Sequence, residues 1–382
     1  MKSMMVSGRI DMNNRGDFSE KCIGILTFPH SASHGAALQM YALYDAVLSL
    51  GERPKIINYY STYMRHVRHT NSANVGTLRS LCYRTVRKVL HLRTIIGFHR
   101  FEEQMDHLPQ RSFSDRACLK TIASDCSAVI CGSDQVWNPD ITNYDLSYFL
   151  DFCGSGTKRI AYAPSFGFTN FPAEYDAAIT NELKQFDAIS IRESQGREKV
   201  KKLIGKEPQI VLDPTFLVPR EKWEALGIPC KTPARYILYY AINRSEEMVK
   251  FCKQLSEKTG LPIVVAGGNI ISKIQSHGKS VQYVPDTDPL RWIYLVSNAT
   301  YVVTNSFHGL SFSIIFRKNF FLDLSSRTND RLEHLISMLG LERQIIRKGI
   351  TTEAIDYKAA DTILDSMVDS SFDYLRQALR DE

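Results

Sequence analysis

The sequence predicts an α/β protein in which two Rossmann-like domains face each other across a cleft. Short β-branched runs alternate with amphipathic helical runs in two separate stretches of the 382-residue chain, a pattern typical of parallel sheets. Four prolines between residues 213 and 234 predict a linker that joins the two stretches. The length suits two domains of about 150–200 residues each, and a hydrophobic content of 44% is enough to fill two cores.

The first domain is expected at residues 21–213, after a polar N-terminal segment at residues 1–20. Its apolar runs predict strands at 21–28, 55–59, 127–131, 159–163, 188–191 and 209–212, and helices at 35–50 and 173–186. The alternation is interrupted at about residues 60–115, which we interpret as an insertion into this domain.

The second domain is expected at residues 235–345, after the linker at 214–234. Strands are predicted at 235–240, 262–266, 281–284, 300–304 and 320–322, and helices at 289–297 and 308–316. Ser245 is a good N-cap for a further helix, which would carry Met248, Phe251 and Leu255 on one face. A C-terminal tail at 346–382 contains a predicted helix at 359–379.

The insertion is strongly basic. Ten Lys and Arg residues and no Asp or Glu lie between Arg53 and Phe101, in a chain whose net charge is +6. Apolar residues recur at helical spacing between residues 78 and 96, so we expect an amphipathic basic helix there. Such a helix suits an anionic membrane surface or an anionic substrate. The alternative is a helix that packs its apolar face on its own domain and leaves its charges in water.

Composition narrows the class of protein. Eight cysteines are scattered with no C-x-x-C pair, which indicates a reducing compartment and argues against a zinc cluster or a disulfide framework. The polar start has no apolar core of a signal peptide, and no run approaches the length of a transmembrane helix. We therefore expect a cytoplasmic protein with no metal site and no nucleic-acid partner.

The most informative candidate site is the loop at residues 132–139, directly after a buried strand. Open α/β sheets bind ligands just past the carboxyl ends of their strands, so side chains here are expected to face a substrate. The alternative is an Asp that accepts hydrogen bonds from turn amides and a Trp that caps the sheet. The candidate residues of this loop are Ser133, Asp134, Gln135, Trp137 and Asn138.

Two further loops and one arginine also directly follow predicted strands. The loop at 31–37 includes His34 and Gly35, and its small residues allow close backbone approach. It is not G-x-G-x-x-G, so a dinucleotide is poorly supported. Arg192 follows another strand and is suited to grip a carboxylate or phosphate, unless it forms a surface pair with Glu193. The third loop contains Asn305, Ser306, His308 and Gly309, with His308 at a helix N-terminus where an anion is favoured. The alternative for His308 is a residue that only caps backbone donors.

From residue 21 to about residue 343 the chain resembles the polysaccharide pyruvyl transferases. The resemblance rests on the order and spacing of several runs, at residues 24–27, 35–43, 132–138, 189–193, 213–215 and 305–309. It implies a two-domain fold of the GT-B type and the transfer of the enolpyruvyl carbons of phosphoenolpyruvate to a sugar as a ketal. The family's acidic, arginine and histidine positions map onto Asp134, Arg192 and His308.

This resemblance implies roles for the candidate residues. His308 and Asp134 become the catalytic pair, while Arg192, Asn305, Ser306 and Gly309 are expected to bind the donor. The acceptor is expected to contact His34 and Gly35 and, from the loop after the third strand, Ser133, Gln135, Trp137 and Asn138, with the Trp137 face against a sugar ring. The chemistry requires no metal, flavin or nucleotide, and phosphoenolpyruvate is a co-substrate rather than a cofactor.

The chain departs from the family pattern in two places. Many members have an arginine and a leucine before the histidine, where this chain has Ser306 and Phe307. We therefore expect Arg159, Arg317 or Lys318 to replace the missing cation. The first loop often reads Asn-Tyr-Gly, where this chain has residues Ser33, His34 and Gly35.

Three functions remain open at this point. The first is a pyruvyl transferase of exopolysaccharide or capsular polysaccharide biosynthesis, acting at the inner face of the membrane on a sugar of a cell-surface polysaccharide or of its lipid-linked oligosaccharide precursor. The second is a GT-B-type glycosyltransferase that uses a nucleotide sugar. The third is a non-catalytic glycan-binding protein of envelope assembly.

Overall fold

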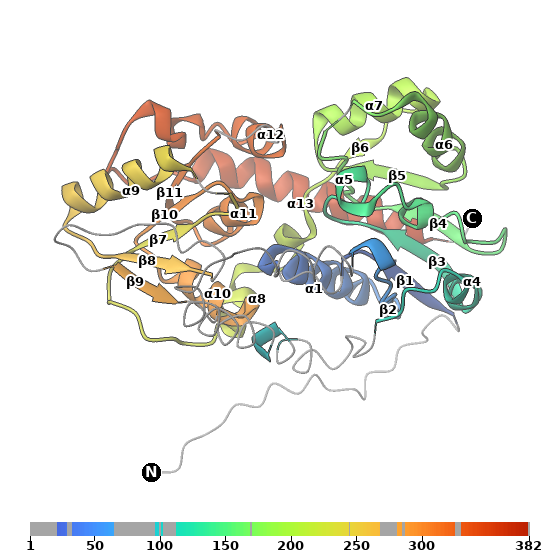
Figure 1. Ribbon diagram of the computed structural model, residues 1–382, viewed down its shortest axis with the longest axis horizontal. Coiled ribbons are helices and arrows are strands. Elements are labelled where there is room, and N and C mark those ends of the chain that lie inside the picture. Colours follow the sequence, from blue (N-terminus) through green and yellow to red (C-terminus); the bar gives the residue numbers. More distant parts are fainter. Residues whose placement is uncertain are drawn as a thin grey trace, which may run out of the picture.

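The structure is a computed structural model that describes residues 21–28, 33–64, 96–98, 101, 112–168, 170–243, 245–267, 281–284, 287–324 and 330–380. It contains two parallel β-sheets, each covered by helices, that lie side by side (Figure 1). The α/β class and the two Rossmann-like domains are thus confirmed. The polar segment at 1–20 and nearly all of the expected basic helix at 78–96 lie outside the described residues.

The first sheet has the strand order β2-β1-β3-β4-β5-β6. Its strands run parallel, with Ile25 of β1 opposite Ile130 of β3. The apolar runs found in the sequence become its buried centre, which explains why they lack the alternation of a half-exposed strand. The bounds are β1 Cys22–Leu26, β2 Pro54–Ile56, β3 Cys126–Cys131, β4 Lys158–Ala161, β5 Ala188–Ile191 and β6 Gln209–Ile210, with helices α1 His34–Ser49, α4 Ala117–Ser124, α5 Pro139–Thr142, η1 Leu146–Phe149, α6 Ala173–Leu183 and α7 Ser194–Ile204.

The second sheet has the order β11-β10-β7-β8-β9 and is also parallel. Ser245 caps α9 as expected, since its hydroxyl accepts a hydrogen bond from the amide of Met248. The bounds are β7 Ile237–Tyr240, β8 Ile263–Ala266, β9 Val281–Val284, β10 Tyr301–Thr304 and β11 Asn319–Leu322, with helices α9 Glu246–Thr259, α10 Pro289–Ser297, α11 Phe307–Ile315, α12 Asp330–Met338, η3 Glu342–Gln344 and η4 Ile346–Lys348.

The segment expected as a linker is folded. It forms η2 (Pro214–Leu217) and α8 (Arg220–Leu226). Trp223 of α8 is completely buried, with its ring centroid 5.4 Å from that of Tyr41 in α1 and 5.0 Å from that of Phe312 in α11. Pro214 and Pro219 therefore stand at the starts of the two short helices that fill the junction between the domains.

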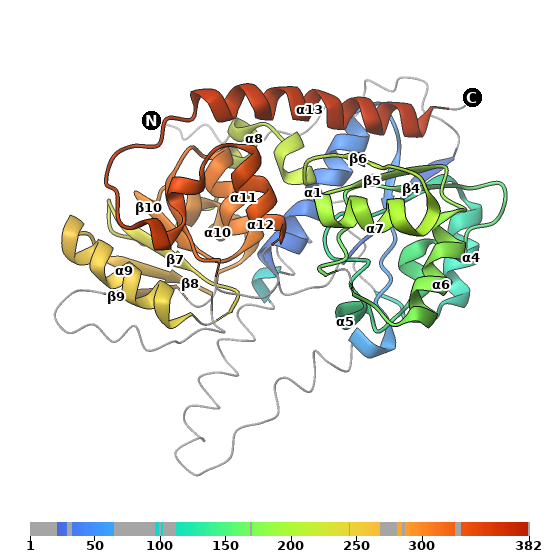
Figure 2. The same ribbon diagram turned by 90° about the horizontal axis from the view of Figure 1, so that it is seen from above.

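The C-terminal helix α13 (Lys358–Leu379) ties the domains together. It begins beside the second sheet, where the Tyr357 hydroxyl donates to the carbonyl oxygen of Lys318. It then crosses to the first sheet, as Figure 2 shows. There the hydroxyl of Tyr374 donates to the Ala161 carbonyl oxygen at 2.9 Å, and the Leu212 amide donates to the Ser371 hydroxyl at 3.0 Å. No helix in the described part of the chain is long and apolar enough to span a bilayer.

Candidate active site

A buried aspartate, Asp213, is the centre of the site. It lies where the first domain ends and η2 begins, and its Oδ1 accepts hydrogen bonds from the amide and hydroxyl of Thr215 at 3.1 and 2.8 Å. Its Oδ2 faces residues from both domains: Nη1 of Arg192 at 2.6 Å, the Ser133 hydroxyl at 3.2 Å and Nε2 of His308 at 3.7 Å. One carboxylate therefore connects the carboxyl ends of β3, β5 and β10.

Arg192 follows β5 and is almost completely buried. Besides its ion pair with Asp213, its Nη2 lies 3.7 Å from Asp134 Oδ1, and its Nε lies 3.8 Å from Glu193 Oε2. The Arg192 and Glu193 side chains are only 3% and 5% exposed, so this is a buried pair and not the surface pair considered as the alternative. The guanidinium centre also lies 4.4 Å from the ring centroid of Phe307, within cation–π range.

His308 enters from the first turn of α11. Ser306 caps this helix by accepting a hydrogen bond from the amide of Gly309, so capping is not the task of His308. The imidazole packs against Gly35 of the first domain so closely that a Cβ on Gly35 would lie 2.0 Å from Nδ1. Gly35 thus allows α1 to approach, and His308 is held with Nε2 toward Asp213.

Asp134 occupies a sparsely populated backbone region, with φ of 73°. The carbonyl oxygen of Asp134 accepts a hydrogen bond from the amide of Ser165, and its Oδ1 accepts one from the amide of Gln135. This strained conformation directs the carboxylate toward Arg192, and also to within 4.0 Å of Nη1 of Arg331 from α12. Such strain is often retained at functional sites.

The charges in this cluster shift one another's pKa values. Burial by itself would raise the pKa of Asp213, but the facing His308 and Arg192 outweigh it and hold the pKa well below its usual range. Burial raises the pKa of Glu193, with Arg192 and Arg331 opposing the shift. Burial and then repulsion from Arg192 lower the pKa of Arg331 to about 10.

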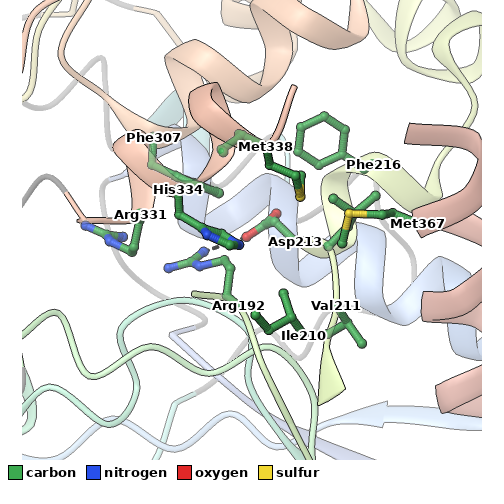
Figure 3. Close-up of a pocket in the computed structure, with 12 residues that line it drawn as sticks. Arg192, Ile210, Val211, Asp213, Phe216, Phe307, Arg331, His334, Met338 and Met367 are labelled. Carbon is green, nitrogen blue, oxygen red and sulfur yellow. Dashed lines mark hydrogen bonds and ion pairs between the residues drawn. The ribbon is translucent and has the colours of Figure 1, made fainter. Parts of the chain in front are cut away.

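Several buried polar atoms in the site have no hydrogen-bond partner among the described residues. They are Nε and Nη2 of Arg192, Nε of Arg331, Nε2 of His308, Nε2 of His334 and Oε2 of Glu193. Arg192, Asp213, Phe307, Arg331 and His334 line one end of a pocket, and apolar residues line the rest (Figure 3). Buried polar atoms are costly unless they are paired, so the unsatisfied nitrogens of this cluster are suited to the oxygen atoms of a polar ligand.

Residues 34–322 match the family model of the polysaccharide pyruvyl transferases. The chain belongs to this family. No match to a curated protein was found. The expected family membership is thereby confirmed, and the family assigns a transferase.

Solved structures with a similar fold share little sequence with this member of the pyruvyl transferase family. The chain is similar to a UDP-GlcNAc 2-epimerase from Neisseria meningitidis bound to UDP-GlcNAc, with a TM-score of 0.49, 10% identity and 94% of each chain covered. It is also similar to UGT89C1 from Arabidopsis thaliana complexed with quercetin, with a TM-score of 0.43, 12% identity and 94% of each chain covered. A UDP-GlcNAc 2-epimerase from Methanocaldococcus jannaschii gives a TM-score of 0.43 at 10% identity, over 91% of this chain and 92% of that one.

The structure brings some of the expected residues of this family together and not others. Asp134, Arg192, His308, Ser133 and Gly35 meet in one cluster. Asn305 lies nearby, but its amide accepts from the backbone of Ile242 and donates to that of Asn243, and so holds the loop after β7. Ser306 and Gly309 form the helix cap, and a Cβ on Gly309 would lie 2.3 Å from the hydroxyl oxygen of Thr304. These three residues shape the loop that presents His308.

Trp137 is the clearest correction. We expected its face to meet a sugar ring, but the indole is completely buried in the first domain. It stacks on Phe149 at 5.0 Å between ring centroids, packs against Phe166, and donates its N–H to the carbonyl oxygen of Tyr148. The expectation was wrong because the chain turns after Asp134 and sends Trp137 back under the sheet.

Gln135 and Asn138 brace the loop. The Asn138 amide donates to Gln135 Oε1 at 2.9 Å, and its Oδ1 caps α5. Both side chains lie so close to Gly167 that a Cβ there would meet them at 2.4 Å. In this conformation the two amides are engaged within the protein, and Asp134 is the acidic group of the loop that reaches the cluster.

His34 is also held by the protein. Its Nε2 lies 2.8 Å from the Thr287 carbonyl oxygen and its Nδ1 3.3 Å from the Tyr240 hydroxyl, while the ring stacks on Trp292. Burial lowers its pKa to about 4, against a smaller opposing effect of the Thr287 carbonyl. His34 therefore joins the first domain to the second as a neutral ring.

Two important residues were missed from the sequence. Asp213 directly follows an apolar strand, as Asp134 does, and that position was the available signal. Arg331 gives no such signal, because it arrives from a helix that the sequence pattern did not reveal. Two of the three expected replacements for the family arginine are engaged elsewhere: Arg159 pairs with Glu182 at 3.1 Å, and Arg317 with Asp361 at 2.6 Å.

Proposed function

We propose that this protein transfers the enolpyruvyl carbons of phosphoenolpyruvate to two hydroxyls of a sugar, forming a pyruvate ketal and releasing phosphate. The observation that carries the proposal is the convergence of His308, Arg192 and two carboxylates, Asp134 and Asp213, in a buried cluster made by both domains. The family assignment supports the reaction class.

The donor is an anion with a carboxylate and a phosphate, and the cluster offers it cationic partners. Nε and Nη2 of Arg192 make no hydrogen bond with the described residues, and they are suited to a two-pronged contact with an oxyanion. A planar guanidinium provides such a contact better than a lysine ammonium does.

The reaction needs a proton donor for the methylene carbon and a base for the attacking hydroxyl. We assign the donor to Nε2 of His308, which has no hydrogen-bond partner in the described residues and faces Asp213. Asp213 would compensate the positive charge of a protonated imidazole. Asp134, with its side chain 14% exposed, is assigned to the sugar hydroxyl.

The bond changes balance without an oxidant or reductant. Protonation of the methylene gives an oxocarbenium-like centre, which one sugar hydroxyl attacks. Loss of phosphate regenerates that centre, and attack by the second hydroxyl closes the ketal. Of the two hydroxyl protons, one balances the new methyl group and the other leaves on phosphate. We propose a lipid-linked oligosaccharide as the acceptor of this cell-surface polysaccharide pathway.

The test is proton NMR of a mixture of the protein, phosphoenolpyruvate and galactose-, glucose- or mannose-type acceptors. The expected result is a new ketal methyl singlet together with an equal amount of released phosphate. Incubation with nucleotide sugars in place of phosphoenolpyruvate is the parallel arm. Sugar transfer in that arm with no ketal signal in the first would refute the proposal in favour of a glycosyltransferase.

A variant of His308 distinguishes an enzyme from a glycan-binding protein without activity. If His308→Ala leaves glycan binding and cellular function intact, the site has no catalytic task. If the variant binds phosphoenolpyruvate but forms no ketal, the catalytic assignment is supported.

A further inference from the structure

Arg331 lies farther from a carboxylate than Arg192, the other arginine of the site. It projects from the first turn of α12, its side chain is only 13% exposed, and its Nε has no hydrogen-bond partner in the described residues. The carboxylate oxygen that it approaches, Asp134 Oδ1, is 4.0 Å from its Nη1, at the limit of an ion pair. Arg192, in contrast, has the Asp213 carboxylate at 2.6 Å.

The fold keeps this cation in place despite an electrostatic cost. Burial, followed by repulsion from Arg192, disfavours the charged form of Arg331, and the nearby carboxylates offset this only in part. Removing a guanidinium from water without a close partner is unfavourable. An additional anion at this position would remove that imbalance.

Both guanidiniums lie close to the ring of Phe307. The Arg192 and Arg331 guanidinium centres lie 4.4 and 5.7 Å from the centroid of its ring. Both also face Asp134, and both line the polar end of the pocket in Figure 3. Both guanidiniums therefore lie within cation–π range of one phenyl ring, and this ring does not compete for their hydrogen bonds.

We propose that Arg331 is a second donor-binding residue, which grips an oxyanion group of the donor together with Arg192. This inference rests on the proposed function. Many family members have an arginine before this histidine, where this chain has Ser306 and Phe307. In this chain, Arg331 of α12 would supply the missing cation. The matched family region ends at residue 322, so the family model assigns nothing to Arg331.

The direct test is calorimetric titration of phosphoenolpyruvate, inorganic phosphate and pyruvate into the wild type, Arg331→Gln and Arg331→Lys. Loss of a charge-assisted contact corresponds to about a 10- to 100-fold weaker affinity for phosphoenolpyruvate in Arg331→Gln. Arg331→Lys should be intermediate, because it keeps the charge but not the fork. If the variant has a lower affinity for inorganic phosphate, Arg331 contacts the phosphate group of the donor. If it has a lower affinity for pyruvate, Arg331 contacts the carboxylate. Arg347→Gln is the matched control, since Arg347 is 65% exposed, and its affinity should stay within about twofold of the wild type.

Thermal melts separate a binding role from a structural one. Without ligand, Arg331→Gln should melt at or above the wild-type temperature, because repulsion with Arg192 is relieved. The rise in melting temperature that phosphoenolpyruvate induces in the wild type should be reduced in the variant. A lower melting temperature combined with unchanged affinity would overturn the inference and make Arg331 a structural residue.

These experiments distinguish an error in the role of Arg331 from an error in the proposed function. Wild-type ketal formation with unchanged affinity in Arg331→Gln would refute the role of Arg331 alone. Phosphoenolpyruvate or phosphate binding that depends on Arg331, in a wild type that forms no ketal, would support the anion site and refute the proposed reaction.

Discussion

Replacing Asp213 by Asn should destabilise the protein strongly although the shape of the side chain is preserved. Oδ1 can still accept the two hydrogen bonds from Thr215. The new amide nitrogen, however, would face Nη1 of Arg192 at the 2.6 Å position of Oδ2, so that two donors meet. The guanidinium would lose its closest negative charge while remaining buried.

The magnitude follows from this geometry. Breaking a buried ion pair by removing one partner costs about 3–5 kcal/mol in the free energy of unfolding. Asp134 and Glu193 still lie within 4 Å of Arg192, so the lower end, about 3 kcal/mol, is expected. This corresponds to a fall of about 6–12 °C in melting temperature for a domain of this size.

Urea denaturation followed by circular dichroism, without ligand, measures the effect. Asp361→Asn is the matched control, because Asp361 pairs with Arg317 at the same 2.6 Å but with 36% of its side chain exposed. The control should lose at most about 1 kcal/mol. Equal shifts of the two variants would refute the argument that burial makes the Asp213 pair strong.

The pH dependence gives a second check of the same residue. Because folding lowers the pKa of Asp213, its carboxylate stabilises the protein above the unfolded pKa of about 3.9. This contribution disappears as the pH falls through the lower pKa of the folded state. The stability difference between wild type and Asp213→Asn should therefore be constant near neutral pH and shrink in acid. A difference that grows on acidification would contradict the direction of the pKa shift.

Four further predictions address the site and the basic insertion. His308→Ala should lower kcat by about 10²–10⁴ while the melting temperature changes little, and a variant that keeps a third of the wild-type rate would show that His308 is not the proton donor. Asp134→Asn should lower kcat more than phosphoenolpyruvate affinity, as measured by steady-state titration; an equal loss of both would place Asp134 at the donor. Gly35→Ala should displace His308 and abolish turnover, because the added Cβ would lie 2.0 Å from Nδ1, whereas normal activity would show that α1 and α11 can separate freely. The wild type should sediment with anionic vesicles at low salt and detach as salt rises, at about 1 kcal/mol per engaged cation, whereas its absence from vesicles at low salt would mean that the charges serve another purpose. The variant that should abolish this adsorption replaces Arg84, Arg87, Lys88 and Arg93 by Gln.

The sequence predicted the sheets and the strand-end positions well, because both depend on local patterns. Apolar β-branched runs determine which segments become buried parallel strands, and polar residues directly after them must lie at one edge of a sheet. Asp134, Arg192 and His308 were found in this way, and the structure brings them together. Trp137 follows the same strand as Asp134 yet lies in the core. Its direction depends on the backbone turn at Asp134, which composition does not reveal.

The second guanidinium of the site, that of Arg331, could not be predicted from the sequence for a different reason. The sequence argument offered Arg159, Arg317 or Lys318 as its source, and Arg159 pairs with Glu182 in the first domain. The side chain of Arg317 turns instead to Asp361 of α13, and its Nη1 donates to the carbonyl oxygen at the end of α11. Arg331 comes from α12, which packs on α11 of the second domain, and its contact with Asp134 of the first domain exists only in the folded protein.

The position of Asp213 links the assembly of the two domains to the electrostatics of the site. Ser133 and Arg192 reach this carboxylate from the first domain, and His308 reaches it from the second. The close packing of His308 on Gly35 of α1 leaves no room for the imidazole to retreat toward the first domain. Separation of the domains would therefore remove His308 from Asp213 and leave the Arg192–Asp213 pair intact on one side. It follows that anion binding by Arg192 alone should survive partial domain separation, whereas proton transfer by His308, and any contact that needs both Arg192 and Arg331, should require the docked arrangement that α8 and α13 maintain.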